Sequence, residues 1–276
     1  MIDLDAYFAR IGYAGERTPT LATLNAIVHA HVLAIPFENL DVLLGLPIDL
    51  APEALERKLV HGRRGGYCFE QDSLLLYVLE QLGFDVHPIS ARVRYQRSRD
   101  FTPARTHVFV RVELEESWLA DVGVGAMSPT AALRLAETGP QPTPHETRRL
   151  LRENDRLYHQ VLFGESWEDV CEFTLEEMPP IDREVANWYT SAHPGSHFKN
   201  RLLVARALPE GRRVTLLNRE LTVRQGDGSA ERRVLTSPDE LLAALDEHFG
   251  LTFPARTRFQ CEALDWPTAR VPFPTS

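Results

Sequence analysis

The sequence predicts an α+β protein in three successive parts, because the spacing of its apolar residues changes twice along the chain. Up to about residue 85, apolar residues recur at helical spacing. From about Val86 they alternate, which is typical of strands and favours a sheet or a barrel. After about residue 196 the pattern is mixed, with short strands leading to one more helix. The loop from Ala192 to Ser196 contains proline and glycine, so we expect it to connect the last two parts.

Four helices are expected in the first part. Gly12 ends the first, Thr18 and Pro19 supply an N-cap and a first-turn proline for the second, and Pro36 stops it. The fourth starts beside Cys68 and has a stripe of leucine and valine up to Gly83. The expected ranges are 3–11, 18–35, 49–61 and 68–82.

The second part should consist of strands. Alternating segments lie at 90–96, 106–115, 118–122, 148–152, 156–163 and 170–175. A short helix from about Ile181 follows the two prolines 179 and 180. In the third part, strands are expected at 202–207, 213–217, 220–224 and 232–235. A capping box at Ser237 and Glu240 then opens a helix that Gly250 closes.

Composition limits the possible setting and partners. The 276 residues are 43% hydrophobic and 25% charged, as in ordinary globular proteins with a large core. A net charge of −9 argues against nucleic acid as a partner. No apolar run approaches the roughly 20 residues of a membrane span, so we expect no membrane partner. Three widely spaced cysteines and an N-terminus without signal-peptide features predict a reducing cytoplasm.

Cys68 is a candidate nucleophile because a glycine-rich turn, Arg63 to Gly66, runs into a helix at this residue. The unpaired N–H groups of a helix start favour a thiolate over a thiol, and a thiolate is the species that attacks carbonyl carbon. Arg63 and Arg64 would add positive charge nearby. A small buried hydrophobic residue is the alternative interpretation of this cysteine.

A cysteine nucleophile requires a base and a group that orients the base. His107 is the candidate base, because it lies early in a strand and points away from the face that Val108, Val110 and Val112 share. Asp121 is the candidate acid, because aspartate is disfavoured in strands and costly to bury unpaired. An aspartate at a strand end that is satisfied by turn amides fits the pattern equally well.

The register between these two strands decides whether His107 and Asp121 can meet. A two-residue turn at Glu115 and Glu116 pairs His107 with Val124, which leaves Asp121 roughly 10 Å away and on the wrong face. One extra residue or a differently placed turn would restore the parity. The local pattern alone does not establish the pairing.

Four separate motifs resemble the arylamine N-acetyltransferase family in the same order and at similar separations. They are Ile35–Asp41, Arg64–Glu70, Thr106–Val108 and Ala120–Gly123. The resemblance implies a catalytic triad of Cys68, His107 and Asp121. It also implies a cysteine-protease-like core within a helical bundle at 1–85, a β-barrel at 86–195 and an α/β lid at 196–276.

The reaction that the resemblance implies is a ping-pong acetyl transfer with acetyl-CoA as co-substrate and no bound cofactor. Cys68 would take the acetyl group, backbone N–H groups at the helix start could hold the oxyanion, and an arylamine would then resolve the acetyl-cysteine. Arylhydrazines and N-hydroxyarylamines are further acceptors within the family's range. No metal is expected, because His29 and His31 are spaced wrongly for one helix face.

The resemblance also marks candidate acceptor-binding residues and two departures from the family. The candidates are Phe37, Phe69, Val124 and Gly125. The family often has phenylalanine where this chain has Val124, and asparagine where it has Asp72. A carboxylate one turn after Cys68 would oppose the thiolate if it faced inward, and we expect Asp72 on a solvated helix face instead.

Other functions compete with this interpretation. Relatives on the same fold close amide bonds, and a papain-like or transglutaminase-like hydrolase would use the same order of Cys, His and Asp. A non-enzymatic protein would use Cys68 as a redox sensor or as a packed thiol. The arginine-rich stretch Arg92–Arg105 fits either a solvated edge or a contact for CoA phosphates.

Overall fold

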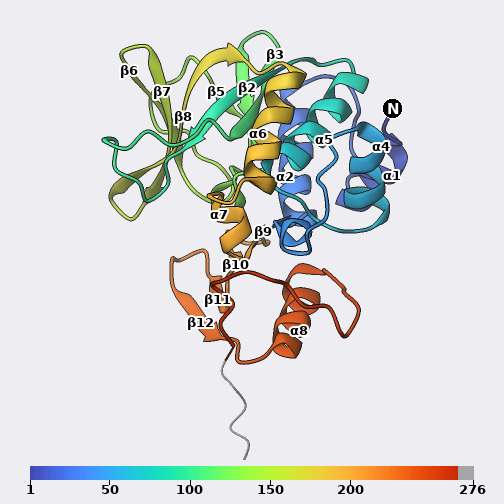
Figure 1. Ribbon diagram of the computed structural model, residues 1–276. Coiled ribbons are helices and arrows are strands. Elements are labelled where there is room, and N and C mark those ends of the chain that lie inside the picture. Colours follow the sequence, from blue (N-terminus) through green and yellow to red (C-terminus); the bar gives the residue numbers. More distant parts are fainter. Residues whose placement is uncertain (267–276) are drawn as a thin grey trace, which may run out of the picture.

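Figure 1 shows the computed structural model, which describes residues 1–266. Helices from the first third of the chain lie side by side, a curved sheet from the middle lies next to them, and a smaller C-terminal lobe packs below both. The α+β fold with three parts is confirmed. No helix within residues 1–266 is long and apolar enough to cross a membrane.

The first part contains five α-helices and a π-helical turn. Their bounds are α1 Leu4–Ile11, α2 Leu21–Ala34, α3 Leu40–Leu43, α4 Pro52–Leu55, η1 Glu56–His61 and α5 Cys68–Gln81. Asp3 caps α1 by accepting from the Ala6 N–H, and Gly12 ends it with φ +68°. The second helix starts later than expected, because Thr20 rather than Thr18 is its N-cap and accepts from the Thr23 N–H.

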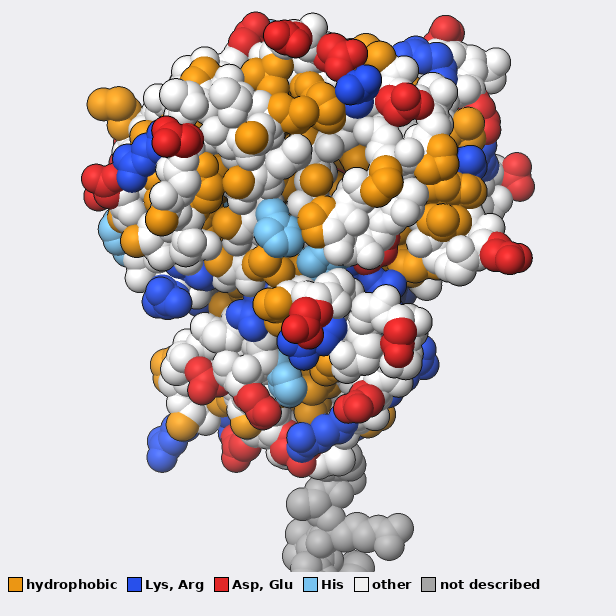
Figure 2. Space-filling view, turned by 180° about the vertical axis from the view of Figure 1, so that it is seen from behind, with side chains coloured by type: hydrophobic (Ala, Val, Ile, Leu, Met, Phe, Trp, Pro, Cys, Tyr) orange, Lys and Arg blue, Asp and Glu red, His pale blue; other side chains and the backbone are white. Residues whose placement is uncertain are grey.

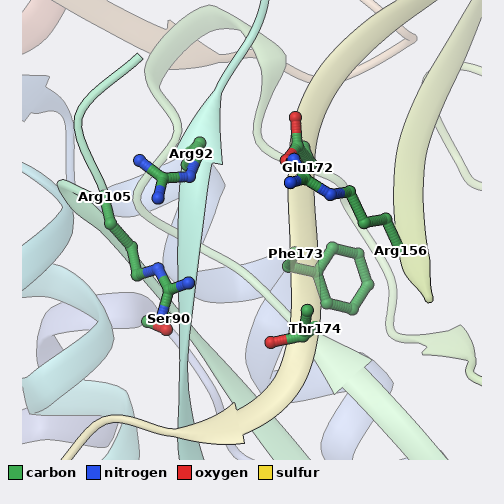
Figure 3. Close-up of a pocket in the computed structure, with 7 residues that line it drawn as sticks. All are labelled: Ser90, Arg92, Arg105, Arg156, Glu172, Phe173 and Thr174. Carbon is green, nitrogen blue, oxygen red and sulfur yellow. The ribbon is translucent and has the colours of Figure 1, made fainter. Parts of the chain in front are cut away.

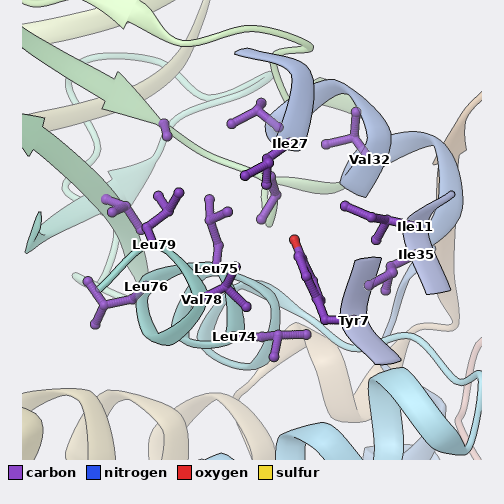
Figure 4. Packing of buried hydrophobic residues seen from close by; sticks show 14 of the residues in the cluster. Tyr7, Ile11, Ile27, Val32, Ile35, Leu74, Leu75, Leu76, Val78 and Leu79 are labelled. Atoms are coloured by element: carbon purple, nitrogen blue, oxygen red, sulfur yellow. The ribbon is translucent and has the colours of Figure 1, made fainter. Parts of the chain in front are cut away.

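Three of these helices share one apolar core. Figure 4 shows side chains of α1, α2 and α5 converging, among them Tyr7, Ile27 and Leu75, none of which is exposed. His31 is buried in the same region between the hydroxyl of Tyr7 and the amide oxygen of Gln71. The apolar face of α5 therefore packs into this core, and this packing fixes the position of the helix and of its first turn.

The second part is a seven-stranded antiparallel sheet in the order β5-β4-β3-β2-β8-β7-β6. The bounds are β2 Asp85–Val93, β3 His107–Glu113, β4 Ser117–Ala120, β5 Leu133–Arg134, β6 Arg148–Glu153, β7 Arg156–Phe163 and β8 Ser166–Glu177. Contacts between the outer strands β5 and β6 make the sheet a nearly closed barrel. The sequence pattern did not predict β5, which is two residues long, and β2 starts at Asp85 instead of the expected Ser90.

The turn between β3 and β4 resolves the question of register. Glu113 pairs with Ser117, so the loop has three residues instead of two. Continuing this register sets His107 opposite Gly123, two residues beyond Asp121. Residues two apart in a strand share a face, so His107 and Asp121 lie on the same side of the sheet.

The third part is built around a five-stranded antiparallel sheet in the order β1-β9-β10-β11-β12. Helix α6, Pro180–Ala192, lies beside α5 in the main body (Figure 1) and leads to this part. The other bounds are β1 Phe37–Glu38, α7 His197–Asn200, β9 Leu203–Ala207, β10 Arg213–Leu217, β11 Glu220–Arg224, β12 Ala230–Val234 and α8 Pro238–Phe249. Ser237 caps α8 by accepting from the Glu240 N–H, as expected, but the Glu240 carboxylate accepts from the Thr236 N–H and so does not complete the capping box. The edge strand β1 comes from the first third of the chain, so the exact boundaries at 85 and 195 stay predictions.

Candidate active site

Cys68 is the first residue of α5, at the point where the glycine-rich turn meets the helix. Its thiol is buried and lies 3.5 Å from the carbonyl oxygen of Thr106, the residue before β3. Gly123 packs directly on this turn, since a Cβ there would lie 2.6 Å from the Cys68 Cα and would overlap the Asp72 carboxylate. Only glycine lets the end of β4 approach the helix start so closely.

His107 and Asp121 form a buried pair beside this turn. The His107 Nε2 lies 3.0 Å from Asp121 Oδ2, and the Gly123 N–H donates to Asp121 Oδ1 over 2.9 Å. The Phe109 ring meets the imidazole edge-on, with 4.9 Å between the centroids. One carboxylate thus holds the ring while a backbone amide holds the carboxylate, so the imidazole is fixed in orientation. The structure brings all three sequence-predicted residues into one region.

The electrostatics at Cys68 differ from the expectation. Burial, followed by the charges of Asp72 and Asp121, raises the pKa of the Cys68 thiol well above its ordinary value. The Phe69 N–H acts in the opposite direction but does not outweigh them. Arg64 forms ion pairs with Glu38 and Asp41 instead of supporting a thiolate. The helix terminus therefore does not by itself ionise Cys68, and a neighbouring base must take the proton.

Asp72 corrects another expectation, because it is buried instead of solvated, with 1% of its surface exposed. Its Oδ1 accepts from the Val122 N–H over 2.9 Å, whereas its Oδ2 has no hydrogen-bond partner within residues 1–266. Burial and the nearby Asp121 raise the pKa of the Asp72 carboxyl well above its ordinary range. The helical position placed Asp72 on the same side as Cys68, but no pattern in the sequence revealed the burial.

Asp72, His107 and Asp121 form the only cluster of possible metal ligands within residues 1–266. Donor atoms of Asp72, His107 and Asp121 lie within 4.8 Å of one another. Two of them already bond to each other, and the Val122 N–H occupies one oxygen of the third. We interpret this group as a hydrogen-bond network.

Two of the sequence motifs support each other structurally. Glu38 accepts two hydrogen bonds from the Arg64 guanidinium, and backbone bonds join Pro36 and Glu38 to Gly66. A Cβ at Gly65 would overlap the Pro36 carbonyl. The chain 35–41 therefore braces the turn that presents Cys68, a role that sequence reasoning did not assign.

Asn39 extends this brace to the C-terminal lobe. Its amide donates to the carbonyls of Phe198 and Arg201 and accepts from the Leu203 N–H. These bonds cross about 160 positions of sequence, so no local pattern could have predicted them. The brace thus connects the Cys68 turn to the start of β9.

The candidate acceptor-binding residues fall into two groups. Phe37, Val124 and Gly125 are half-buried, and the Phe37 ring contacts Gly125, where a Cβ would lie 3.4 Å away. The Phe37 ring also meets Phe198, with 6.1 Å between centroids. Phe69 has no exposed surface and packs edge-on against Tyr67. The first three residues thus form a partly exposed apolar patch, which we call the rim, while Phe69 lies in the core.

The arginine-rich stretch lines a small cavity of about 70 Å³ between β2 and β8. Figure 3 shows Arg92 and Arg105 beside β2, with Arg156 beside β8. Arg105 is paired with Glu176, and Arg156 with Glu172. Arg92 donates to the Pro103 carbonyl and has no acidic partner within residues 1–266. Most charges of this stretch are therefore neutralised by the barrel itself.

A second buried charge cluster joins the barrel to the lobe. Glu146 accepts from Arg148 of β6 over 2.9 Å, from Arg213 of β10 over 2.7 Å, and from Arg224 of β11. These guanidinium groups hold the pKa of Glu146 below its usual range, although burial opposes the shift. Sequence reasoning missed this cluster, because Glu146 and Arg148 lie more than 60 positions before Arg213 and Arg224.

Comparison with known proteins gives a consistent result. A family model described as N-acetyltransferase matches residues 20–258. The arylamine N-acetyltransferase of Mycolicibacterium smegmatis is 44% identical, covering 91% of this chain and 92% of the relative. A Salmonella typhimurium relative named arylamine N-acetyltransferase / N-hydroxyarylamine O-acetyltransferase is 40% identical, covering 90% and 88%. The Mycobacterium marinum arylamine N-acetyltransferase in complex with CoA superimposes with a TM-score of 0.86 at 40% identity, covering 90% and 92%.

Proposed function

The chain belongs to the arylamine N-acetyltransferase family, and from this premise we propose that Cys68, His107 and Asp121 transfer an acetyl group from acetyl-CoA to an aromatic amine. The observation that carries the proposal is the buried His107–Asp121 pair, joined over 3.0 Å beside the turn that holds Cys68. The Cys68 thiol faces the carbonyl of Thr106, directly before His107. The contact with Thr106 and the oriented imidazole support a Cys68 thiol that acts together with His107 and Asp121.

The first half-reaction begins with proton transfer. Because the pKa of Cys68 is raised in the resting enzyme, His107 takes the thiol proton as acetyl-CoA arrives. The thiolate attacks the thioester carbonyl, and a new C–S bond to Cys68 forms while the bond to CoA sulfur breaks. Backbone N–H groups at the start of α5 hold the oxyanion. The imidazolium returns its proton to the departing CoA thiolate.

The second half-reaction uses the same groups in reverse. An amine nitrogen attacks the acetyl-cysteine carbonyl, His107 accepts the amine proton, and Cys68 leaves as the thiolate that this proton then neutralises. Asp121 holds the imidazole tautomer and stabilises the transient imidazolium. No charge accumulates over the full cycle.

The acceptor would lie over the rim formed by Phe37, Val124 and Gly125. An apolar, aromatic-lined rim suits arylamines and arylhydrazines, because their rings can stack there. N-hydroxyarylamines are a further class of acceptor, in keeping with the name of the Salmonella relative. We assign the enzyme to the reducing cytoplasm, since its three cysteines are free thiols.

Intact mass spectrometry after brief mixing with acetyl-CoA, without acceptor, tests the proposal. We expect a single acetyl adduct that an aromatic amine or hydrazine discharges and that persists in water alone. Cys68→Ala should lack the adduct. Cys171→Ala is the matched control, because Cys171 is another fully buried free thiol, and it should still form the adduct.

Three outcomes would contradict the proposal. An adduct that forms on Cys68→Ala would assign the nucleophile elsewhere. Rapid loss of the adduct in water would indicate a hydrolase. A folded wild-type protein that forms no adduct would exclude acetyl-CoA as the donor and would favour another acyl thioester or amide-bond formation.

A further inference from the structure

Three arginines line one recess between the helical bundle and the C-terminal lobe. The recess has a volume of about 320 Å³, and Arg10, Arg63 and Arg206 lie in its wall, with no acidic residue among the residues that line it. Arg10 belongs to α1, Arg63 follows η1, and Arg206 belongs to β9. In Figure 2, basic side chains gather along the junction between the main body and the lobe.

Two of these arginines use only some of their N–H donors in hydrogen bonds to the protein. Arg10 donates to the carbonyls of Leu59 and Ala34, and Arg206 donates to the carbonyl of Phe249. The Nε of Arg206 is buried and has no partner within residues 1–266. Ala34 ends α2 and Phe249 ends α8, so these two arginines lie against helix C-termini. Several N–H donors of both guanidinium groups remain available.

Arg63 makes no side-chain hydrogen bond or ion pair with any residue of the part of the chain that is described. Its backbone has φ +50°, a left-handed conformation that non-glycine residues rarely adopt. Arg63 is exposed, so its guanidinium group is accessible to a ligand from solvent. Strained backbone at non-glycine residues clusters at active sites and ligand clamps.

Within residues 1–266, no acidic side chain that lines the recess balances its charge. A helix C-terminus carries a partial charge of about −0.5, so the ends of α2 and α8 together offset about one of three positive charges. The remaining guanidinium groups repel each other. Accordingly, burial and then the charges of Arg63 and Arg206 lower the pKa of Arg10 to about 10. A bound anion would remove this repulsion.

We propose that the recess formed by Arg10, Arg63 and Arg206 binds a phosphate group, which links the helical bundle to the C-terminal lobe. Guanidinium groups suit this ligand because their planar N–H pairs bond two oxygens of a tetrahedral oxyanion at once. The phosphate is either free inorganic phosphate or the end of a small phosphomonoester. The proposal does not depend on the acetyl transfer reaction.

Thermal unfolding in phosphate and in chloride, at equal pH and ionic strength and without CoA, tests this inference. Phosphate should raise the Tm of the wild-type protein by about 3 °C at ten times its Kd. Arg63→Gln should lose this increase. Arg232→Gln is the matched control, since Arg232 is an exposed arginine on β12, away from the recess, and this variant should keep the increase.

Two further measurements keep the inference testable. In chloride, Arg63→Gln should be at least as stable as the wild type, because it removes a like charge and breaks no side-chain hydrogen bond or ion pair within residues 1–266. Equilibrium dialysis with labelled phosphate should find about one bound phosphate per chain, lost in Arg63→Gln and in Arg206→Gln. Glycerol 3-phosphate in place of inorganic phosphate distinguishes an esterified from a free ligand.

Either of two results would overturn the inference. An equal Tm increase in all variants would place the bound phosphate elsewhere. No increase and no dialysis signal with either ligand in the wild type would mean that the arginines serve only as caps for helix ends.

Discussion

Two buried charge clusters of the protein, one around Cys68 and one around Glu146, have opposite imbalances. Around Cys68, the carboxylates of Asp72 and Asp121 are close together with no lysine or arginine among their hydrogen-bond partners. Around Glu146, three arginines share a single carboxylate. His159 lies between the clusters, 3.2 Å from Arg148 Nη1, and burial lowers its pKa well below the ordinary value.

The difference separates a reactive site from a structural one. Arginine remains charged under ordinary conditions, so the groups of the Glu146 cluster keep their protonation states. The cluster joins β6, β10 and β11 in one geometry. The Cys68 cluster contains groups whose protons can move, and the raised pKa of Cys68 keeps its proton available for transfer. Groups that can exchange protons thus lie at the proposed active site, and groups of fixed charge lie where the barrel meets the C-terminal lobe.

The largest expected effect is that of Asp121→Asn. The amide would no longer stabilise an imidazolium on His107, so the rate of acetyl adduct formation should fall by about 10³-fold or more. Rapid-quench mass spectrometry measures this rate. Asp169→Asn is the control, since Asp169 pairs with Arg99 on the barrel and should leave the rate unchanged. A loss of less than tenfold would mean that Asp121 is only a structural partner.

Glu146→Gln should break the second cluster. It leaves three guanidinium groups without a counter-charge, which should cost about 3–5 kcal/mol of unfolding free energy. Denaturant unfolding measures this cost. Because the cluster is structural, the acetylation rate of the remaining folded protein should change little at low temperature. A variant with unchanged stability and a slow acetylation rate would reverse the roles that we give to the two clusters.

The smallest effect on the acetylation rate is expected at Asp72, where stability should depend on pH instead. Its raised pKa means that the folded state binds a proton which the unfolded state, with a carboxyl pKa near 3.8, releases. Stability is therefore fully present below that value and falls as the pH rises above it, until the folded pKa is reached. Asp72→Asn should remove this dependence of stability on pH and should preserve acetylation.

Urea unfolding of both proteins at pH 5, 6 and 7 measures the difference at Asp72. The advantage of Asp72→Asn should grow with pH. The prediction would be contradicted if the free energies of unfolding of the two proteins changed equally with pH and if Cys68 were alkylated at lower pH in the variant. Asp72 would then be ionised in the wild type.

Much of this architecture could be predicted from local pattern. The apolar stripe after Cys68 and the valine face of β3 determined the helix and strand that carry Cys68 and His107. Short elements escaped detection, because β1 and β5 have two residues each and no period can be recognised in them. The register of β3 and β4 depended on one loop residue, Leu114, which period alone cannot assign.

Charges that meet across the fold were the least predictable. The solvated interpretation of Asp72 was wrong, because burial of a helix face depends on what packs there, and here the end of β4 with Gly123 does. Glu146 precedes β6, whereas two of its arginines lie on β10 and β11, and no local sequence pattern predicts contacts over such a separation. The family resemblance joined Cys68, His107 and Asp121, but it said nothing of the clusters around them.

The pairing of β1 with β9 has a consequence for synthesis on the ribosome. Phe37 pairs with Ala205, so the first strand of the C-terminal sheet is made long before its neighbour. Until about residue 207 emerges, the β1 edge and the Asn39 amide lack their partners. A nascent or truncated chain should therefore carry an exposed strand edge beside the Cys68 turn. Completion of the turn is thereby tied to completion of the polypeptide.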